Sequence, residues 1–217
     1  LIGLEYAWRR SGPMSMAPSQ LGAFTRSSPA FEWPNIEYHV QPLSLDAFGE
    51  PLHAFPAITA SVCNLNPTSR GTVHIKSNRF EDAPAIAPNY LATDEDRQVA
   101  ADSLRVTRRI MAQPAMARFK PEEFKPGVQY QSDDELARLA GDIASTIFHP
   151  VGTTAMGRDG DPLAVLTPRL QVRDGAGGTI AGLRLVDAGA MPTITSGNTN
   201  SPTLMMAEKA ARWIAGR

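Results

Sequence analysis

A short segment around one histidine is the first place in this chain where side chains could do chemistry. Residues 148–157 read Phe-His-Pro-Val-Gly-Thr-Thr-Ala-Met-Gly. Pro150 biases His149 towards an extended backbone, and Gly152 permits a close approach behind the imidazole. A neutral histidine can accept a proton near pH 7, so His149 is a candidate general base. Taken alone, a single histidine is more often a structural residue, and that alternative stays open.

A second segment, residues 196–202, reads Ser-Gly-Asn-Thr-Asn-Ser-Pro and leads into a predicted helix. Ser201 is the expected N-cap of that helix, and Pro202 is its expected first residue. Asn198 and Asn200 offer amide donors and acceptors at this point. The start of a helix presents free backbone N–H groups and a partial positive charge, which suit a developing anion. The alternative is an ordinary capped loop, in which asparagine, serine and glycine are common.

The elements that must position these segments follow from the apolar periodicity. Strands are predicted over residues 23–26, 36–42, 57–66 and 71–77, with shorter extended pieces at 169–172 and 183–187. Helices are predicted at residues 1–10, over 93–113, from 132 to about 147, and from 201 onward. The strands come first and the helices later, without strand-helix-strand alternation. This order predicts an α+β fold, in which helices cover one side of an antiparallel sheet.

Composition and charge exclude several classes of protein. The 217 residues include 21 basic and 22 acidic side chains, with 42% hydrophobic residues. These values are typical of a globular protein and argue against disorder or a coiled coil. The near-neutral balance predicts no nucleic-acid partner and no anionic membrane surface as partner. The longest uncharged stretch, residues 188–207, contains prolines, a central glycine and asparagines, so no transmembrane segment is predicted.

Cysteine and histidine usage predicts no metal site. Cys63 is the single cysteine, which excludes an intrachain disulfide and a cysteine-based cluster. The four histidines show neither HxxxH nor HExxH spacing. Because nothing requires an oxidising compartment, the cytoplasm is favoured. The chain begins at Leu1, without Met or a signal-like segment, so we expect it to be part of a longer protein.

In their order along the chain and in their residues, three segments resemble the C-terminal part of the glucose–methanol–choline (GMC) family of flavin oxidoreductases. Residues 148–153 with 156–157 are similar to its HPVGT-x-x-MG segment, and 185–188 with 191–192 to its VDAS-x-MP segment. Residues 196–200, 202–203 and 207–211 are similar to its SGN-x-N-x-PT…AEKAA ending. Weaker similarity at residues 12–13 and 22–24 extends the resemblance towards the N-terminus.

This resemblance implies a catalytic pair and an FAD cofactor. His149 is the implied active-site base and Asn198 its hydrogen-bond partner, in the oxidation of a primary alcohol to an aldehyde with hydride transfer to flavin N5. Phe148 is expected to line the substrate pocket, where an aromatic wall favours alcohols with an apolar or aromatic body. Phe148 belonging to the core is the alternative.

The same resemblance assigns cofactor-binding residues. Thr199 and Asn200 are implied to lie against the pyrimidine edge of the flavin. Asp187 and Ala188 are implied to lie near the phosphates and the ribityl chain of FAD. Asp187 capping a turn is the alternative. The chain has Gly189 where the family pattern has serine, which removes one hydroxyl.

The implied domains are a substrate-binding domain, residues 1–148, and a C-terminal segment, residues 149–217, which returns to complete an FAD-binding Rossmann-like domain. No G-x-G-x-x-G follows a strand in this chain, and the family binds ADP through that fingerprint. The N-terminal FAD-binding portion of the same protein is therefore an expected partner, beside a small-molecule alcohol and an electron acceptor, either oxygen or a quinone or dye. One alternative is a non-catalytic binding or structural module without flavin. A serine hydrolase is a more remote alternative, because the G-x-S-x-G motif of such enzymes is missing from this chain.

Overall fold

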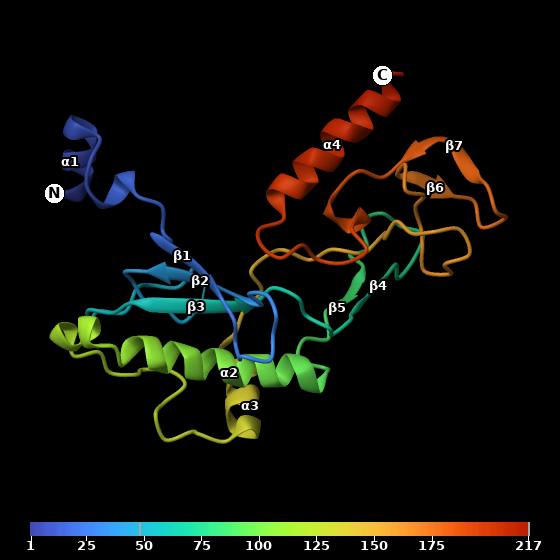
Figure 1. Ribbon diagram of the computed structural model, residues 1–217. Coiled ribbons are helices and arrows are strands. Elements are labelled where there is room, and N and C mark those ends of the chain that lie inside the picture. Colours follow the sequence, from blue (N-terminus) through green and yellow to red (C-terminus); the bar gives the residue numbers. More distant parts are fainter. Residues whose placement is uncertain (48, 217) are drawn as a thin grey trace. The chain divides into compact units, whose positions relative to one another are not determined.

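The chain forms two compact units in the computed structural model, which describes residues 1–47 and 49–216. The first unit comprises Leu1–Asn64 and Arg97–Ser145, and the second comprises Leu65–Asp96 and Thr146–Arg217. Figure 1 shows the elements of each unit in sequence colours. The two segments singled out for their chemistry, residues 148–157 and 196–202, both belong to the second unit.

A three-stranded antiparallel sheet is the centre of the first unit. It consists of β1 (Leu21–Thr25), β2 (Ile36–Gln41) and β3 (Thr59–Asn64), in the order β1-β2-β3. In the central strand Ile36 and Tyr38 are buried on one face, and Glu37 and His39 alternate onto the other. Tyr38 lies opposite Ala23 of β1 and Val62 of β3, which fixes the register across the sheet.

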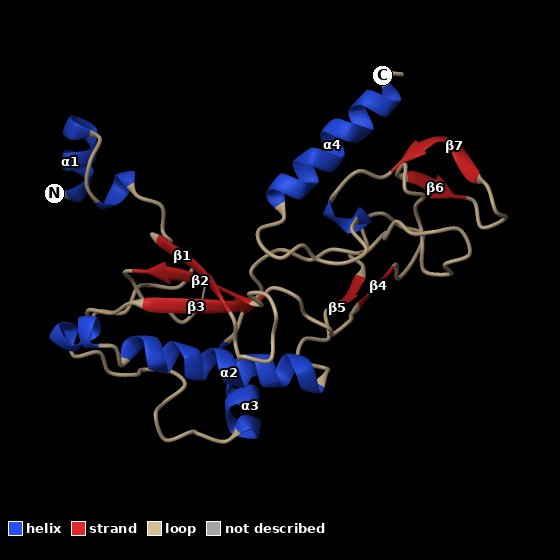
Figure 2. Ribbon diagram, in the orientation of Figure 1, coloured by secondary structure: helices blue, strands red, loops and turns tan. Residues whose placement is uncertain are grey.

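Helix α2 (Asp94–Met111) covers the apolar face of this sheet (Figure 2). Val99 and Val106 are seven residues apart, about two helical turns, so both side chains face the sheet and pack with Ile36 and Tyr38. The Tyr38 hydroxyl lies 2.9 Å from Thr107 Oγ1, which satisfies its polar end inside the apolar layer. The predicted α+β arrangement, a helix on one side of an antiparallel sheet, is confirmed in this unit.

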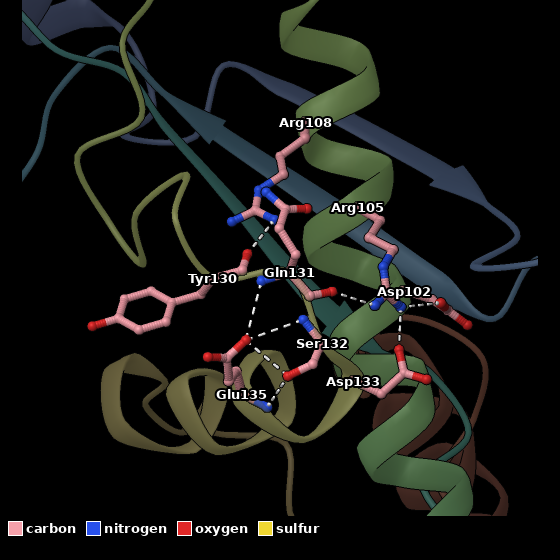
Figure 3. Close-up of polar contacts among 8 residues, drawn as sticks. All are labelled: Asp102, Arg105, Arg108, Tyr130, Gln131, Ser132, Asp133 and Glu135. Carbon is pink, nitrogen blue, oxygen red and sulfur yellow. Dashed lines mark hydrogen bonds and ion pairs between the residues drawn. The ribbon is translucent and has the colours of Figure 1, made fainter.

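Helix α3 (Asp133–Ile143) begins at the predicted position, with Ser132 and Glu135 forming a capping box. The Glu135 backbone N–H donates to Ser132 Oγ at 3.4 Å, and the Ser132 N–H donates to the Glu135 carboxylate at 3.1 Å. Figure 3 shows how Arg105 of α2 joins this turn by pairing with Asp102, at 3.2 Å, and with Asp133. The helix ends at Ile143, earlier than predicted. The apolar spacing continues to residue 147, but Ala144 already has an extended backbone.

Arg108 holds the loop between α2 and α3 against α2. Its guanidinium donates two hydrogen bonds of 2.8 Å to the Glu123 carboxylate. It also donates to the carbonyl oxygens of Gly127, at 3.0 Å, and of Tyr130, at 2.9 Å. This hydrogen bonding by Arg108 lowers the pKa of Glu123 below its ordinary value, against the opposing effect of burial. The remaining elements of this unit are α1 (Ile2–Arg9), η1 (Pro13–Ser15) and η2 (Pro114–Phe119).

The second unit combines two small hairpins, a short turn of 3₁₀ helix and the final helix. Its elements are β4 (Thr72–His74), β5 (Ala85–Ala87), β6 (Gln171–Arg173), β7 (Thr179–Arg184), η3 (Ala188–Ala190) and α4 (Asn200–Ile214). Strands β4 and β5 pair with each other, and β6 pairs with β7. Buried Leu166, Leu170, Ala190 and Ala210 form its core, so the loops around β6, the η3 turn and α4 pack on one another.

Some predicted element boundaries are wrong. Helix α4 begins at Asn200 with Thr199 as its N-cap, so Ser201 is not the N-cap. Strand β7 ends at Arg184, before most of the stretch predicted to be extended, and the prediction missed β5 because three residues carry little periodicity. At the start of α2, Thr93 Oγ1 accepts the Asp96 N–H at 3.2 Å, and the Asp96 carboxylate accepts N–H groups of residues 68 and 69.

None of the helices among the described residues combines the length and the apolar character that crossing a bilayer requires.

Candidate active site

The two chemically interesting segments meet at a hydrogen bond. His149 Nδ1 lies 2.7 Å from Thr199 Oγ1, although the two residues are 50 positions apart. His149 is half-buried, and Thr199 is buried with 7% of its surface exposed. With Nδ1 engaged, Nε2 is the ring nitrogen that is left to act on another molecule. An imidazole held in this way can accept a proton through Nε2.

The histidine segment runs beside the η3 turn. The Thr154 N–H donates to the Gly189 carbonyl oxygen at 3.1 Å, and the Met156 N–H donates to the Ala190 carbonyl oxygen at 2.9 Å. Gly152 has a φ of +83°, and a side chain there would come within 3.4 Å of the Met191 carbonyl oxygen. A residue with Cβ is strained at such a φ, so glycine allows the turn after His149. These contacts fix the histidine loop on the η3 turn.

Asp187 caps the η3 turn. Its Oδ1 accepts the Gly189 backbone N–H at 2.7 Å. The space beside Gly189 is tight, because an added Cβ would lie 2.4 Å from Thr153 Oγ1 and 3.1 Å from Thr154 Oγ1. The Thr154 hydroxyl is itself buried and has no hydrogen-bond partner within the described structure. Asp187 thus caps a turn, which was the structural alternative for this residue. The buried Thr154 hydroxyl near the same turn lacks a hydrogen-bond partner.

The start of α4 has the features of an anion-binding helix terminus. Thr199 is the N-cap, but its side chain makes no capping hydrogen bond. The adjoining Asn198 and Asn200 are exposed. Backbone N–H groups at such a helix start carry a partial positive charge and accept an anionic or electron-rich partner. Within the described structure no hydrogen bond joins Asn198 to His149, and the predicted pairing of these two side chains stays a prediction.

The sequence interpretation missed the contact between Thr199 and His149. It placed Thr199 against the pyrimidine edge of the flavin because of the residue's place in the motif. The signal that could have found the contact is Pro202, three residues later, which lacks the N–H that an N-cap threonine usually binds. Phe148, by contrast, is 67% exposed. It belongs to neither hydrophobic core of the described residues.

The other histidines have structural partners in the first unit or lie on an exposed strand. His53 Nδ1 lies 3.0 Å from Ser44 Oγ, and its ring stacks on Phe55 with centroids 5.0 Å apart. His74 is exposed on β4. These contacts and positions give His53 and His74 no arrangement comparable to that of His149.

One group of metal-ligand side chains lies on the sheet of the first unit. Ligand atoms of Glu37, His39 and Cys63 lie within 4.8 Å of one another, and His39 Nε2 is 3.4 Å from Glu37 Oε1. Strand register brings them together, since Glu37 lies directly opposite Cys63. Burial, with the neighbouring Glu37 charge, raises the pKa of the Cys63 thiol to about 11. The thiol is therefore protonated at neutral pH, which disfavours metal binding.

Comparison with known proteins places this geometry in context. A family model described as GMC oxidoreductase matches residues 67–207. The oxygen-dependent choline dehydrogenase of Pseudomonas fluorescens (strain Pf0-1) is 40% identical over 221 residues, which cover 100% of this chain and 37% of that protein. An alcohol dehydrogenase [acceptor] of Pseudomonas putida is 39% identical, over 99% of this chain and 38% of its own length. The chain thus spans little more than a third of the curated relatives it matches.

Solved structures give the same picture. The crystal structure of pyridoxine 4-oxidase from Mesorbium loti superimposes with a TM-score of 0.80 at 28% identity, covering 92% of this chain and 38% of that one. A formate oxidase of Aspergillus oryzae, from a study of FAD modification, gives a TM-score of 0.81 over 99% of this chain and 41% of its own. At 21% identity the second match supports the fold alone.

Proposed function

This chain belongs to the GMC oxidoreductase family, and we propose that it forms the substrate-binding and C-terminal part of an FAD-dependent enzyme that oxidises the CH–OH group of an alcohol. The observation that carries the proposal is the hydrogen bond between His149 and Thr199, which brings the two motif segments to one place. A base and a helix start with free N–H groups then adjoin in one unit. Alcohol oxidation by hydride transfer can use both, the base to take the hydroxyl proton and the helix start to stabilise the negative charge that gathers on the reduced flavin.

His149 is the proposed base. Hydride leaves an alkoxide much more readily than a neutral alcohol, so removal of the hydroxyl proton is the step that a side chain must assist. The Nδ1 atom of His149 is engaged with Thr199, so Nε2 takes the proton. We assign Asn198, whose neutral amide can donate a hydrogen bond, to the same substrate oxygen. It is exposed one residue before the helix N-cap, within a segment that Thr199 ties to His149.

The described residues fit a flavin nucleotide. FAD, when bound, supplies the hydride acceptor of the reaction. Thr199 and Asn200 at the start of α4 offer a partial positive charge to the pyrimidine edge, where negative charge gathers on reduction. Asp187 and Ala188 are assigned to the phosphates and the ribityl chain. The unpartnered hydroxyl of Thr154 beside Gly189 is a buried donor that a cofactor would satisfy.

We assign a primary alcohol as the substrate. We also propose that the glycine-rich fingerprint for FAD lies in another part of the same protein. The matched relatives bear the names choline dehydrogenase and alcohol dehydrogenase, both of which act on alcohols. The exposed ring of Phe148 favours a substrate with an apolar or aromatic body. Residues 1–148 are the proposed substrate-binding domain, and 149–217 the segment that completes the FAD-binding domain. Oxygen or a quinone or dye is the electron acceptor.

Mixing the whole protein with a panel of primary alcohols, without oxygen, tests the function. Choline, benzyl alcohol and a long-chain aliphatic alcohol sample cationic, aromatic and apolar bodies. We expect at least one of them to bleach the visible absorption of the bound flavin. A preparation that holds FAD but is reduced by none of a wide alcohol panel would refute the assignment. A whole protein that never contains FAD would instead favour the non-catalytic module.

A further inference from the structure

The hydrogen bond between Thr199 and His149 involves the ring nitrogen that the proposed reaction does not use. Thr199 Oγ1 lies 2.7 Å from His149 Nδ1, and Thr199 is 7% exposed. In a neutral imidazole one nitrogen carries the proton and the other accepts one. The partner of Nδ1 therefore decides which nitrogen is free to act as a base.

The position of Pro202 leaves the Thr199 oxygen free to accept. Thr199 is the N-cap of α4, and an N-cap hydroxyl usually accepts the backbone N–H of the second or third helical residue. The third helical residue is Pro202, which has no N–H. The Thr199 side chain makes no capping hydrogen bond at all. Its lone pairs are thus available for a donor from elsewhere, and His149 Nδ1 lies 2.7 Å from the hydroxyl oxygen.

The Thr199 side chain is held by its own backbone. The Thr199 carbonyl oxygen accepts the Thr203 N–H at 3.1 Å and the Thr203 hydroxyl at 2.7 Å. These bonds tie Thr199 to the first turn of α4, and burial restricts its rotamer. The hydroxyl that faces His149 is therefore fixed to a helix rather than to a mobile loop, which is the support that a precisely placed base requires.

We propose that Thr199 is a positioning residue for His149, accepting a hydrogen bond from Nδ1–H so that Nε2 stays unprotonated and faces the substrate. This inference rests on the proposed function of His149 as the base. The same hydrogen bond persists after Nε2 takes the alcohol proton, because both ring nitrogens of the imidazolium are donors. Proton transfer then needs no rearrangement around the ring. The role differs from the flavin contact that the sequence motif implies for Thr199.

The tautomer of His149 tests this directly in the whole protein. Histidine labelled with ¹⁵N in the ring gives separate signals for protonated and unprotonated nitrogens, and His149→Gln assigns the relevant pair. In the wild-type protein, with the ring neutral, we expect a protonated Nδ1. Thr199→Val, which removes the hydroxyl at nearly constant volume, should shift the population towards the Nε2–H form. Thr199→Ser should restore the wild-type signals.

Thr203→Val is the matched control, because it removes a neighbouring hydroxyl whose 2.7 Å hydrogen bond does not involve His149, while the residue 203 N–H keeps its own 3.1 Å bond to the Thr199 carbonyl oxygen. It should leave the His149 signals unchanged. If Thr199→Val fails to fold, Thr199→Ala serves in its place. An unchanged tautomer in the folded Thr199 variant would overturn the proposal, and so would a shift equally large in Thr203→Val.

Flavin reduction by an alcohol separates this inference from the proposed function. Thr199→Val should slow reduction about tenfold, equivalent to about 1.4 kcal/mol in the barrier, with Thr199→Ser near the wild-type rate. The two ideas can fail separately. If Thr199→Val shifts the His149 tautomer but His149→Ala keeps full reduction activity, the positioning role is upheld and His149 as the base is refuted. An unshifted tautomer would refute the positioning role whatever the enzyme's activity.

Discussion

Removing the Arg108 guanidinium should lower the unfolding free energy of the first unit more than removing an exposed ion pair does. Arg108 gives two hydrogen bonds of 2.8 Å to Glu123 and two more to loop carbonyl oxygens (Figure 3 shows the one to Tyr130). The two charged side chains are 21% and 17% exposed. Arg108→Met therefore leaves a largely buried carboxylate without its main donor, beside carbonyl groups that lose theirs.

The expected cost follows from these contacts. Breaking a buried charged pair by removing one partner costs about 3–5 kcal/mol. Because part of each Arg108 and Glu123 side chain stays in water, we take the lower end, about 3 kcal/mol at pH 7. The exposed pair Arg138–Asp142, at 3.1 Å with side chains 62% and 57% exposed, is the matched control. Arg138→Met should cost less than about 0.5 kcal/mol.

The effect of Arg108 should depend on pH in a defined direction. Hydrogen bonds from Arg108 lower the pKa of Glu123 in the folded chain below its ordinary value of 4.5. A carboxylate with a lowered pKa stabilises the fold fully above its unfolded pKa, and this contribution is lost as the pH falls through the folded pKa. The difference in unfolding free energy between the wild type and Arg108→Met should therefore shrink below about pH 4.

Urea unfolding followed by circular dichroism measures these differences. A double-mutant cycle with Arg108→Met and Glu123→Gln isolates the coupling between the two side chains. We expect a coupling of about 2–3 kcal/mol at pH 7, within the range of close charged pairs. A coupling below about 0.5 kcal/mol, equal to that of an exposed pair, would refute the argument from burial and geometry.

Three further predictions concern other sites. The Cys63 thiol, with its pKa raised to about 11 by burial, should react slowly with iodoacetamide at pH 7, and its rate should still be rising above pH 9; a rate that levels off below pH 9 would contradict this. Gly189→Ala should lower the unfolding free energy by about 1–3 kcal/mol, since its Cβ would lie 2.4 Å from Thr153 Oγ1; an unchanged thermal midpoint would show that this turn relaxes freely. Pro202→Ala supplies an N–H that competes for the Thr199 hydroxyl, so it should shift the ¹⁵N signals of His149 in the direction of Thr199→Val but less far, and a shift in the opposite direction would contradict the capping argument.

The layered fold of the first unit was predictable because its pattern is local. The predicted strand over residues 36–42 alternates, which puts Ile36 and Tyr38 on one face, and a spacing of seven residues puts Val99 and Val106 on one face of the predicted helix over 93–113. The capping box at Ser132 was likewise complete within four residues of sequence. In each case the residues that decide the structure are neighbours along the chain.

The contacts that the sequence did not predict are set by tertiary structure. The Asp96 carboxylate binds the backbone at residues 68 and 69 rather than its own helix start. Glu37 and Cys63 meet only through strand register, which no spacing in the sequence records. Thr199 was expected at the flavin, yet its side chain contacts His149, because a proline three residues later removes its usual partner.

The sequence predicted which segments form the candidate site, but not which of their side chains contact one another. Both motif segments lie in the second unit, and Thr199 ties them together as a shared site requires. The pairing of His149 with Asn198 and the flavin contacts of Asp187 and Asn200 remain predictions. They depend on a substrate and a cofactor whose positions the chain alone does not determine.

The single-turnover rate of flavin reduction by an alcohol tests the central claim most directly. It is measured by stopped flow without oxygen, in the wild type, in His149→Ala and in the control His74→Ala, which removes an exposed histidine from β4. General base catalysis contributes about 10²–10⁴-fold, so His149→Ala should keep its FAD and lose at least about 100-fold in rate, while His74→Ala keeps the wild-type rate. Reduction of FAD-loaded His149→Ala at the wild-type rate would contradict the account.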